Sequence, residues 1–157
     1  MTFHSNISPE ERGAMARSFF EQGYNCAQSV VLAFQDITGM DAVFAAKVSA
    51  GFGAGVGRMR QVCGCVSGMA LVSGFLSPFT DPSIKADKSA NYALVQKLAA
   101  EYRQANGSIV CSELLGLKPN EQMTPVAEDR TAEYYKKRPC SELVAMAAEI
   151  IAREISN

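Results

Sequence analysis

The sequence predicts an all-α fold: a single-domain helical bundle of about six helices with a glycine-rich loop before the central apolar helix. Apolar residues recur at helical spacing in most segments, and several of these segments begin with residues that cap helices. No segment of five or more residues alternates between apolar and polar side chains as a strand would. The length of 157 residues and the 48% share of hydrophobic residues suit one compact domain with a buried core.

Capping residues predict where the first helices begin. Ser8 and Glu11 have the spacing of a capping box, and Asn25 and Gln28 repeat that spacing. Asp41 is a third capping residue. The helices predicted from these starts cover residues 9–22, 26–38 and 42–50. Residues 1–7 are expected to form a flexible N-terminus ahead of a single helical domain, residues 8–157.

Glycines occupy every other position from Gly51 to Gly57, which predicts a loop or a close crossing of the backbone. A phosphate-binding loop is the alternative, but a third glycine, a Gly-Lys-Ser/Thr sequence and a preceding strand are all missing. An apolar helix is predicted next, over about 62–76. Its Gly64 and Gly68 lie four residues apart, so a neighbouring helix can approach this one closely.

The second half of the chain contains two long predicted helices and two connections. An amphipathic helix is predicted over about 83–105 and the last helix over about 139–155. Between them, residues 111–115 form a short helical element, and residues 118–131, with two prolines, are predicted as a surface loop. Both long helices have apolar faces that could join copies of the chain into a homo-oligomer.

Charge and histidine content exclude several classes of function. Fifteen Lys and Arg residues stand against sixteen Asp and Glu residues, so no basic excess is present to bind nucleic acid. The single histidine, His4, excludes histidine-dependent triads and His-rich zinc sites. The longest uncharged apolar stretch, 62–76, is shorter than the roughly 20 residues of a membrane-spanning helix. Without an evident signal peptide, the expected location is cytoplasmic.

Four of the five cysteines stand at predicted helix starts. Cys26 follows a cap, Cys63 begins the apolar helix, and Cys111 and Cys140 each precede Ser-Glu-Leu. The free N–H groups and partial positive charge of a helix N-terminus stabilise a thiolate, which attacks disulfides and binds metals. In a reducing compartment such cysteines are reactive, metal-binding or simply buried as small apolar side chains.

The spacing of the cysteines narrows the kinds of site they can form. No pair has the Cys-x-x-Cys spacing, which excludes thioredoxin-type, zinc-ribbon and sequential ferredoxin motifs. Any shared site must therefore be assembled by the fold. Cys65 comes two residues after Cys63 and points away from it if both lie in one helix. We predict that Cys65 packs in the core or serves as a reserve thiol.

Several segments, taken in order, resemble one known family. They are Tyr24–Val30, Gly51–Met59, Val62–Gly68, Cys111–Gly116 and Cys140. Together they resemble the C_GCAxxG_C_C family of redox-active proteins, which are small, single-domain and helical. The resemblance covers roughly residues 8–155 and implies that the hallmark cysteines are Cys26, Cys63, Cys111 and Cys140. Cys65 stands where the Cys-Gly-Ala-x-x-Gly motif of the family usually has alanine. Related segments also resemble parts of larger haem or iron–sulfur electron-transfer proteins.

The leading hypothesis is that the chain is a thiol redox protein and, if it is an enzyme, a thiol oxidoreductase. Its hallmark cysteines are expected to gather at one end of the bundle. They would cycle between thiols and disulfides with an unidentified redox partner, or pass electrons through a thiolate-bound cluster. We expect Cys63 to be the attacking thiol, supported by the glycine loop and by Gly64 and Gly68. Arg58 and Arg60 lie next to the loop and either lower the pKa of the thiol or pair with carboxylates.

Two alternatives remain open. In the first, three or four of the hallmark cysteines (Cys26, Cys63, Cys111 and Cys140) bind zinc or an iron–sulfur cluster, because soft sulfur ligands suit these centres. In the second, the chain is a helical interaction protein whose cysteines are merely buried. This second alternative predicts that the hallmark thiols lie far apart.

Overall fold

The computed structural model describes residues 5–77, 79–118 and 123–156, and across these ranges the chain is all-α, as predicted. The helices are α1 (Pro9–Glu21), α2 (Cys26–Leu32), α3 (Gln35–Thr38), α4 (Ala42–Ser49), α5 (Gly64–Leu76), α6 (Lys85–Asn106), α7 (Cys111–Leu114), α8 (Ala132–Lys137) and α9 (Cys140–Ser156), with a 3-10 turn, η1 (Ala50–Phe52). Strand-like pairing in these ranges is limited to one isolated bridge between Val62 and Val110.

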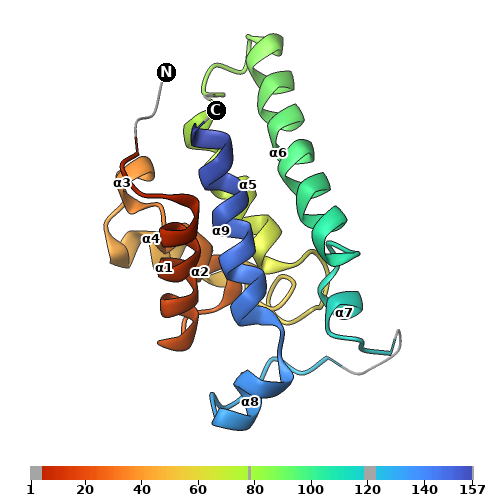
Figure 1. Cartoon of the computed structure of the whole chain (residues 1–157). Helices are drawn as coiled ribbons and strands as arrows, with labels where there is room; N and C mark the ends of the chain where they lie inside the picture. The colour runs from red at the N-terminus through yellow and green to blue at the C-terminus, as the bar shows by residue number, and fades with distance from the viewer. Residues whose placement is uncertain (1–4, 78, 119–122, 157) are drawn as a thin grey trace.

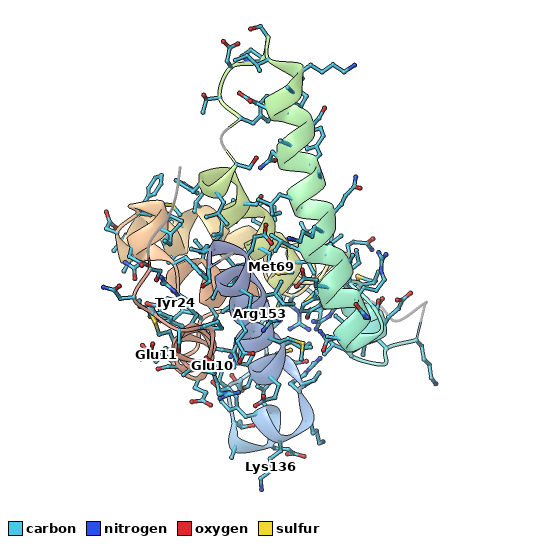
Figure 2. The ribbon with its side chains drawn as sticks, turned by 45° about the horizontal axis from the view of Figure 1, so that its top comes forward. Glu10, Glu11, Tyr24, Met69, Lys136 and Arg153 are labelled. Carbon is cyan, nitrogen blue, oxygen red and sulfur yellow. The ribbon has the colours of Figure 1, made fainter. Side chains whose placement is uncertain are left out.

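Helix α9 is the centre of the bundle. It contacts α1, α2, α5 and α6, and α1 lies along one side of it (Figure 1). Figure 1 also shows that α6 extends beyond the bundle at its N-terminal end, whereas α7 and α8 lie towards the opposite end. Met69 of α5 is buried in the middle of the bundle, and Lys136 on α8 points away from it (Figure 2).

The six helices of seven or more residues are the six that the sequence predicts, with ends shifted by a few residues. Both capping boxes are present, and Asp41 caps α4 through its side chain. The apolar helix begins at Gly64 instead of Val62, and the amphipathic helix at Lys85 instead of Ser83. The short α7 is the predicted element after the amphipathic helix, and α3 and α8 are additions to the predicted set.

The predicted helix over 26–38 is wrong in one respect, because the structure breaks it at Ala33 and Phe34. Phe34 has φ −124° and ψ 30°, outside the helical region. The buried guanidinium of Arg12 donates to the carbonyl oxygen of Ala33, pairs with Asp36 at 2.6 Å and lies over the Phe34 ring. These tertiary contacts bind the Ala33 carbonyl oxygen and the Phe34 ring at the break. The apolar spacing of residues 26–38 does not predict them, because Arg12 comes from another helix.

The glycine-rich segment forms a loop before α5 with an unusual backbone. Ala54, Val56, Arg58 and Arg60 have φ between 54° and 65°, in the left-handed region that favours glycine. Gly55 (φ 72°) and Gly57 (φ 55°) lie in the same region. Each such non-glycine residue costs on the order of 1–3 kcal/mol. Loop hydrogen bonds, from the Gly57 N–H to Gly51 and from the Gln61 N–H to Gly55, hold this conformation. The alternation with glycine thus predicted the loop but not the strain of the residues between the glycines.

After this loop, residues 60–63 run beside residues 109–112. The Cys63 N–H donates to the Ile109 carbonyl oxygen at 2.8 Å, and the Cys111 N–H donates to that of Gln61 at 2.7 Å. The pairing therefore brings the starts of α5 and α7 together, and with them two of the hallmark cysteines.

Parts of two predictions fall outside the described residues: residues 1–4 of the N-terminus, with His4, and residues 119–122 of the predicted surface loop. The described remainder of that loop, residues 123–131, is almost wholly exposed. In the described part of the chain, no helix combines the length and apolar character needed to cross a membrane.

Candidate thiol site

The structure places each hallmark cysteine at the start of a helix, as predicted. Cys26, Cys111 and Cys140 are the first residues of α2, α7 and α9, and Cys63 is the N-cap of α5. All five cysteines are free thiols. Helix starts offer backbone N–H groups and a partial positive charge, both of which favour thiolates.

Two glycines allow α5 to lie directly against α2. A Cβ on Gly64 would come within 3.0 Å of the Cys26 Cβ, and one on Gly68 within 2.9 Å of the Val30 Cβ. Any larger side chain at these positions would force the helices apart. The predicted close approach is therefore present, and it brings Cys26 against the start of α5.

Four of the thiols form a row. Cys140 and Cys65 both lie near enough to Cys26 to lower its pKa, and Cys65 lies near enough to Cys63 to do the same. The row ends at Tyr102, whose hydroxyl oxygen lies 3.3 Å from the Cys63 Sγ. We call Cys140, Cys26, Cys65 and Cys63 the thiol row. Cys111 lies beside it, near enough for the charges of Cys63 and Cys26 to affect its titration.

The thiols of the row have unequal proton affinities. Hydrogen bonds from Cys140 and Cys65 hold the pKa of Cys26 well below its ordinary value, and the charge of Arg130 acts in the same direction. The hydrogen bond from Cys65 lowers the pKa of Cys63, with a smaller contribution from Tyr102. Burial raises the pKa of Cys65, and the Cys26 hydrogen bond raises that of Cys140. The negative charge of the row therefore rests on Cys26 and Cys63.

Exposure separates these two thiolates. Cys26 is partly exposed, whereas Cys63, Cys65, Cys111 and Cys140 are buried. Of the five cysteines, Cys26 thus combines a lowered thiol pKa with a partly exposed residue surface, although burial of the thiol itself acts to raise that pKa.

The two arginines after the glycine loop act elsewhere than on Cys63. The Arg60 guanidinium lies 3.8 Å from the Cys111 Sγ, while burial raises the pKa of that thiol more than Arg60 lowers it. Arg58 donates to the Val126 carbonyl oxygen and lies 3.9 Å from the Glu128 carboxylate. Of the two roles left open for these arginines, Arg58 pairs with a carboxylate and Arg60 contacts a different thiol.

A family comparison agrees with this arrangement of cysteines. The model of the family described as "Putative redox-active protein (C_GCAxxG_C_C)" matches residues 24–154, most of the chain. The chain belongs to the C_GCAxxG_C_C family. Comparisons with curated proteins and with solved structures give no match.

Cys65 is the thiol that this member of the C_GCAxxG_C_C family has in addition to the four hallmark cysteines, and it lies inside the thiol row. The sequence assigned it to packing or reserve on the assumption that Cys63 and Cys65 both lie in the helix. Because Cys63 is the N-cap, with φ −53° and ψ 134°, it stands outside the helical turn and the two thiols meet. Cys65 is fully buried between Cys26 and Cys63 and hydrogen-bonds to both.

Two residues of the site carried no signal in the sequence of this C_GCAxxG_C_C protein. Tyr102 lies near the C-terminal end of α6 at ordinary core spacing, and Arg130 lies near the end of the predicted surface loop. Only the fold brings them to the thiols. Within the described residues, no group of three or more His, Cys, Asp and Glu side chains is arranged to hold a metal ion.

Proposed function

We propose that this C_GCAxxG_C_C protein exchanges thiols and disulfides with a redox partner, and that Cys26 is the attacking thiolate. The observation that carries the proposal is the combination found at Cys26: partial exposure, a lowered pKa and two further thiols near enough to cause that lowering. A thiolate attacks a disulfide only when a partner sulfur can reach it, and a neighbouring thiol is needed to complete the exchange.

The reaction has two steps, in which two electrons pass from the protein to the partner disulfide. The Cys26 thiolate attacks one sulfur of the partner, a mixed disulfide forms, and the other partner sulfur leaves as a thiolate. Cys140 then loses its proton and attacks the Cys26 sulfur, which releases the second partner thiolate. The protein ends with a Cys26–Cys140 disulfide, and the partner disulfide is reduced to two thiols. With a reducing partner the same steps run backwards.

Cys140 is the resolving thiol in this scheme because of its place and exposure. It makes the strongest hydrogen bond to Cys26, and it is 9% exposed, whereas Cys65 is completely buried. Cys65 and Cys63 extend the row inward and accept the disulfide by further exchange. This assigns the attack to Cys26 instead of Cys63, because Cys63 is buried and the two arginines do not contact it.

A reducing compartment such as the cytoplasm suits this chemistry, because five free thiols persist there between turnovers.

Trapping the mixed disulfide tests the proposal. The reduced Cys140→Ser protein is mixed with bis(2-hydroxyethyl) disulfide, and the modified cysteine is located by mass spectrometry of peptides. We expect a stable adduct on Cys26 in this variant and rapid formation of the Cys26–Cys140 disulfide in the unmodified protein. Cys65→Ser is the matched control and should still resolve the adduct.

The outcomes separate the parts of the proposal. If the adduct on Cys26 persists in Cys65→Ser but not in Cys140→Ser, the resolving thiol is Cys65 and not Cys140. Absence of any Cys26 adduct in both variants, with the fold intact by circular dichroism, would refute thiol exchange at this site.

A further inference from the structure

Beside the thiol row lies a cavity of about 440 Å³ with an unusual concentration of positive charge. Its lining includes four arginines, contributed by the glycine loop, the segment before α8 and the residue after α8: Arg58, Arg60, Arg130 and Arg138. Glu128 is the one carboxylate among the lining residues. A second cavity of about 210 Å³ shares Arg58, Arg60, Glu128 and Arg138 and adds Lys118. The volume of the larger cavity lies in the range of small-molecule sites.

The single carboxylate does not neutralise this charge. Glu128 pairs with Arg138 at 2.5 Å and lies 3.9 Å from Arg58. Arg130 instead donates to the backbone carbonyl oxygens of Phe20 and Tyr24, and its guanidinium lies over the Phe20 ring. Arg60 contacts the Cys111 thiol. Among the described residues, neither Arg60 nor Arg130 forms an ion pair with a carboxylate, so both charges remain available to an anionic ligand.

The backbone and packing hold these cations in place. Arg58 and Arg60 are themselves residues of the left-handed backbone of the loop. The Arg130 guanidinium donates to two carbonyl oxygens and lies over three aromatic rings. A guanidinium held in this way binds carboxylates through its planar fork and loses little freedom when it does so.

The cavity adjoins the reactive end of the thiol row. Asn25, which caps α2 immediately before Cys26, lines it, and so does Tyr134 of α8. Arg130 is close enough for its charge to favour the Cys26 thiolate, and Arg138 acts in the same way on Cys140. The cysteines themselves do not line the cavity, and a ligand whose charged end occupies it approaches Cys26 past its chain neighbour Asn25.

We propose that this arginine-lined cavity binds the carboxylates of a small organic disulfide and so presents its sulfur atoms to Cys26. The proposal rests on the thiol exchange proposed above and names the chemical class of its substrate. The exchange is the same reaction: Cys26 forms the mixed disulfide, one carboxylate-bearing thiolate leaves, and Cys140 releases the second. The protein loses two electrons and the substrate gains them.

Three small disulfides with arms of similar length test the proposal. Dithiodiglycolate is anionic, bis(2-hydroxyethyl) disulfide is neutral and cystamine is cationic. Their rates of adduct formation on Cys26 are measured in the reduced Cys140→Ser protein, each divided by the rate of the same disulfide with 2-mercaptoethanol to remove intrinsic reactivity. Charge-assisted hydrogen bonds of the usual strength give an expected preference of about 10-fold or more for the anionic disulfide over the neutral one.

Arginine variants show whether the cavity causes the preference. In the same Cys140→Ser background, Arg60→Gln should remove most of the preference for dithiodiglycolate over the neutral disulfide. Arg153→Gln is the matched control, because it removes the same charge from the other end of α9, outside both cavities. An equal loss in both arginine variants would show a general charge effect and overturn the assignment to the cavity.

A binding measurement without chemistry separates the two proposals. Thiodiglycolate carries the same carboxylates but a thioether in place of the disulfide, and calorimetry on the Cys26→Ser protein measures its binding directly. Binding that Arg60→Gln weakens supports the cavity even if thiol exchange fails. Reaction of Cys26 with all three disulfides at equal normalised rates, without thiodiglycolate binding, would overturn the cavity and leave the thiol exchange standing.

Discussion

The thiols of Cys26 and Cys140, at the starts of α2 and α9, lie near enough to each other to shift each other's pKa. The two cysteines come from opposite ends of the chain, and the packing of α2 against α9 brings them together. The consequences for the two thiols are opposite: the pKa of Cys26 falls and that of Cys140 rises. A pair of this kind holds one thiolate and one thiol ready, as an attacking and a resolving cysteine require.

Selective alkylation should identify Cys26 as the reactive thiol. At about pH 6, well below the ordinary thiol pKa of about 8.5, only a thiol with a lowered pKa is substantially ionised. Brief treatment with iodoacetamide at this pH should label Cys26 first, because Cys63 is buried although its pKa is also lowered. Peptide mapping by mass spectrometry reports the order, and earlier labelling of Cys111 or Cys140 would contradict this assignment.

Replacing Cys65 with alanine should make Cys26 less acidic. The substitution removes one of the two thiols that hydrogen-bond to Cys26 and the thiol that contributes most to the lowered pKa of Cys63. The alkylation rate of Cys26 should then fall at about pH 6 and recover above the ordinary thiol pKa of about 8.5. Tyr102→Phe is the control, since it removes a hydroxyl that lies 3.3 Å from the Cys63 Sγ and does not contribute to the pKa of Cys26, whose pH profile should stay unchanged.

The glycines of α5 should differ sharply in their tolerance of a methyl group. A Cβ on Gly68 would lie 2.9 Å from Val30, so Gly68→Ala should lower the free energy of unfolding by about 1–3 kcal/mol. Gly74 lies in the same helix with nothing within 4 Å of its Cβ position, and Gly74→Ala should be neutral or stabilising by up to about 1 kcal/mol. Urea denaturation compares the two variants. Equal effects would show that α2 and α5 are not held together by this contact.

Stability should decline in alkaline solution. Folding raises the pKa of Cys65 and Cys140, so the unfolded chain loses these protons first, near the ordinary thiol pKa of about 8.5. The contribution of these two thiols to stability is complete below that pH and is lost as the pH rises towards their folded values. Cys26, with its lowered pKa, contributes in the opposite direction, and its contribution is lost as the pH falls through the folded value.

The free energy of unfolding should therefore pass through a maximum near the ordinary thiol pKa and fall above it. Urea denaturation of the reduced protein at a series of pH values up to about 9.5 measures this fall before most lysines, with an ordinary pKa of about 10.4, lose their protons. Cys65→Ala should flatten the alkaline side, because it removes a buried thiol that resists ionisation. A curve with the same alkaline slope in both proteins would exclude Cys65 as a cause.

The sequence by itself determined the helices and the placement of the hallmark cysteines at their starts. Capping boxes and apolar spacing are local properties, and they placed α1 and α9 to within a few residues and α2 correctly at its start. The close approach of α5 to its neighbour followed from Gly64 and Gly68. The break at Phe34 was missed because it depends on a side chain from α1, which no local pattern in that segment records.

Only the tertiary structure decided which thiols meet and which charges surround them. Cys65 can lie in the thiol row because the backbone torsions of Cys63 make it the N-cap of α5 and not a residue inside the helix. Arg130 and Arg138 reach the site from segments that appear in the sequence as a surface loop and a short charged run. Hydrogen bonding, burial and electrostatic attraction act over a few ångströms in space, so thiol acidity depends on the fold more than on the order of residues along the chain.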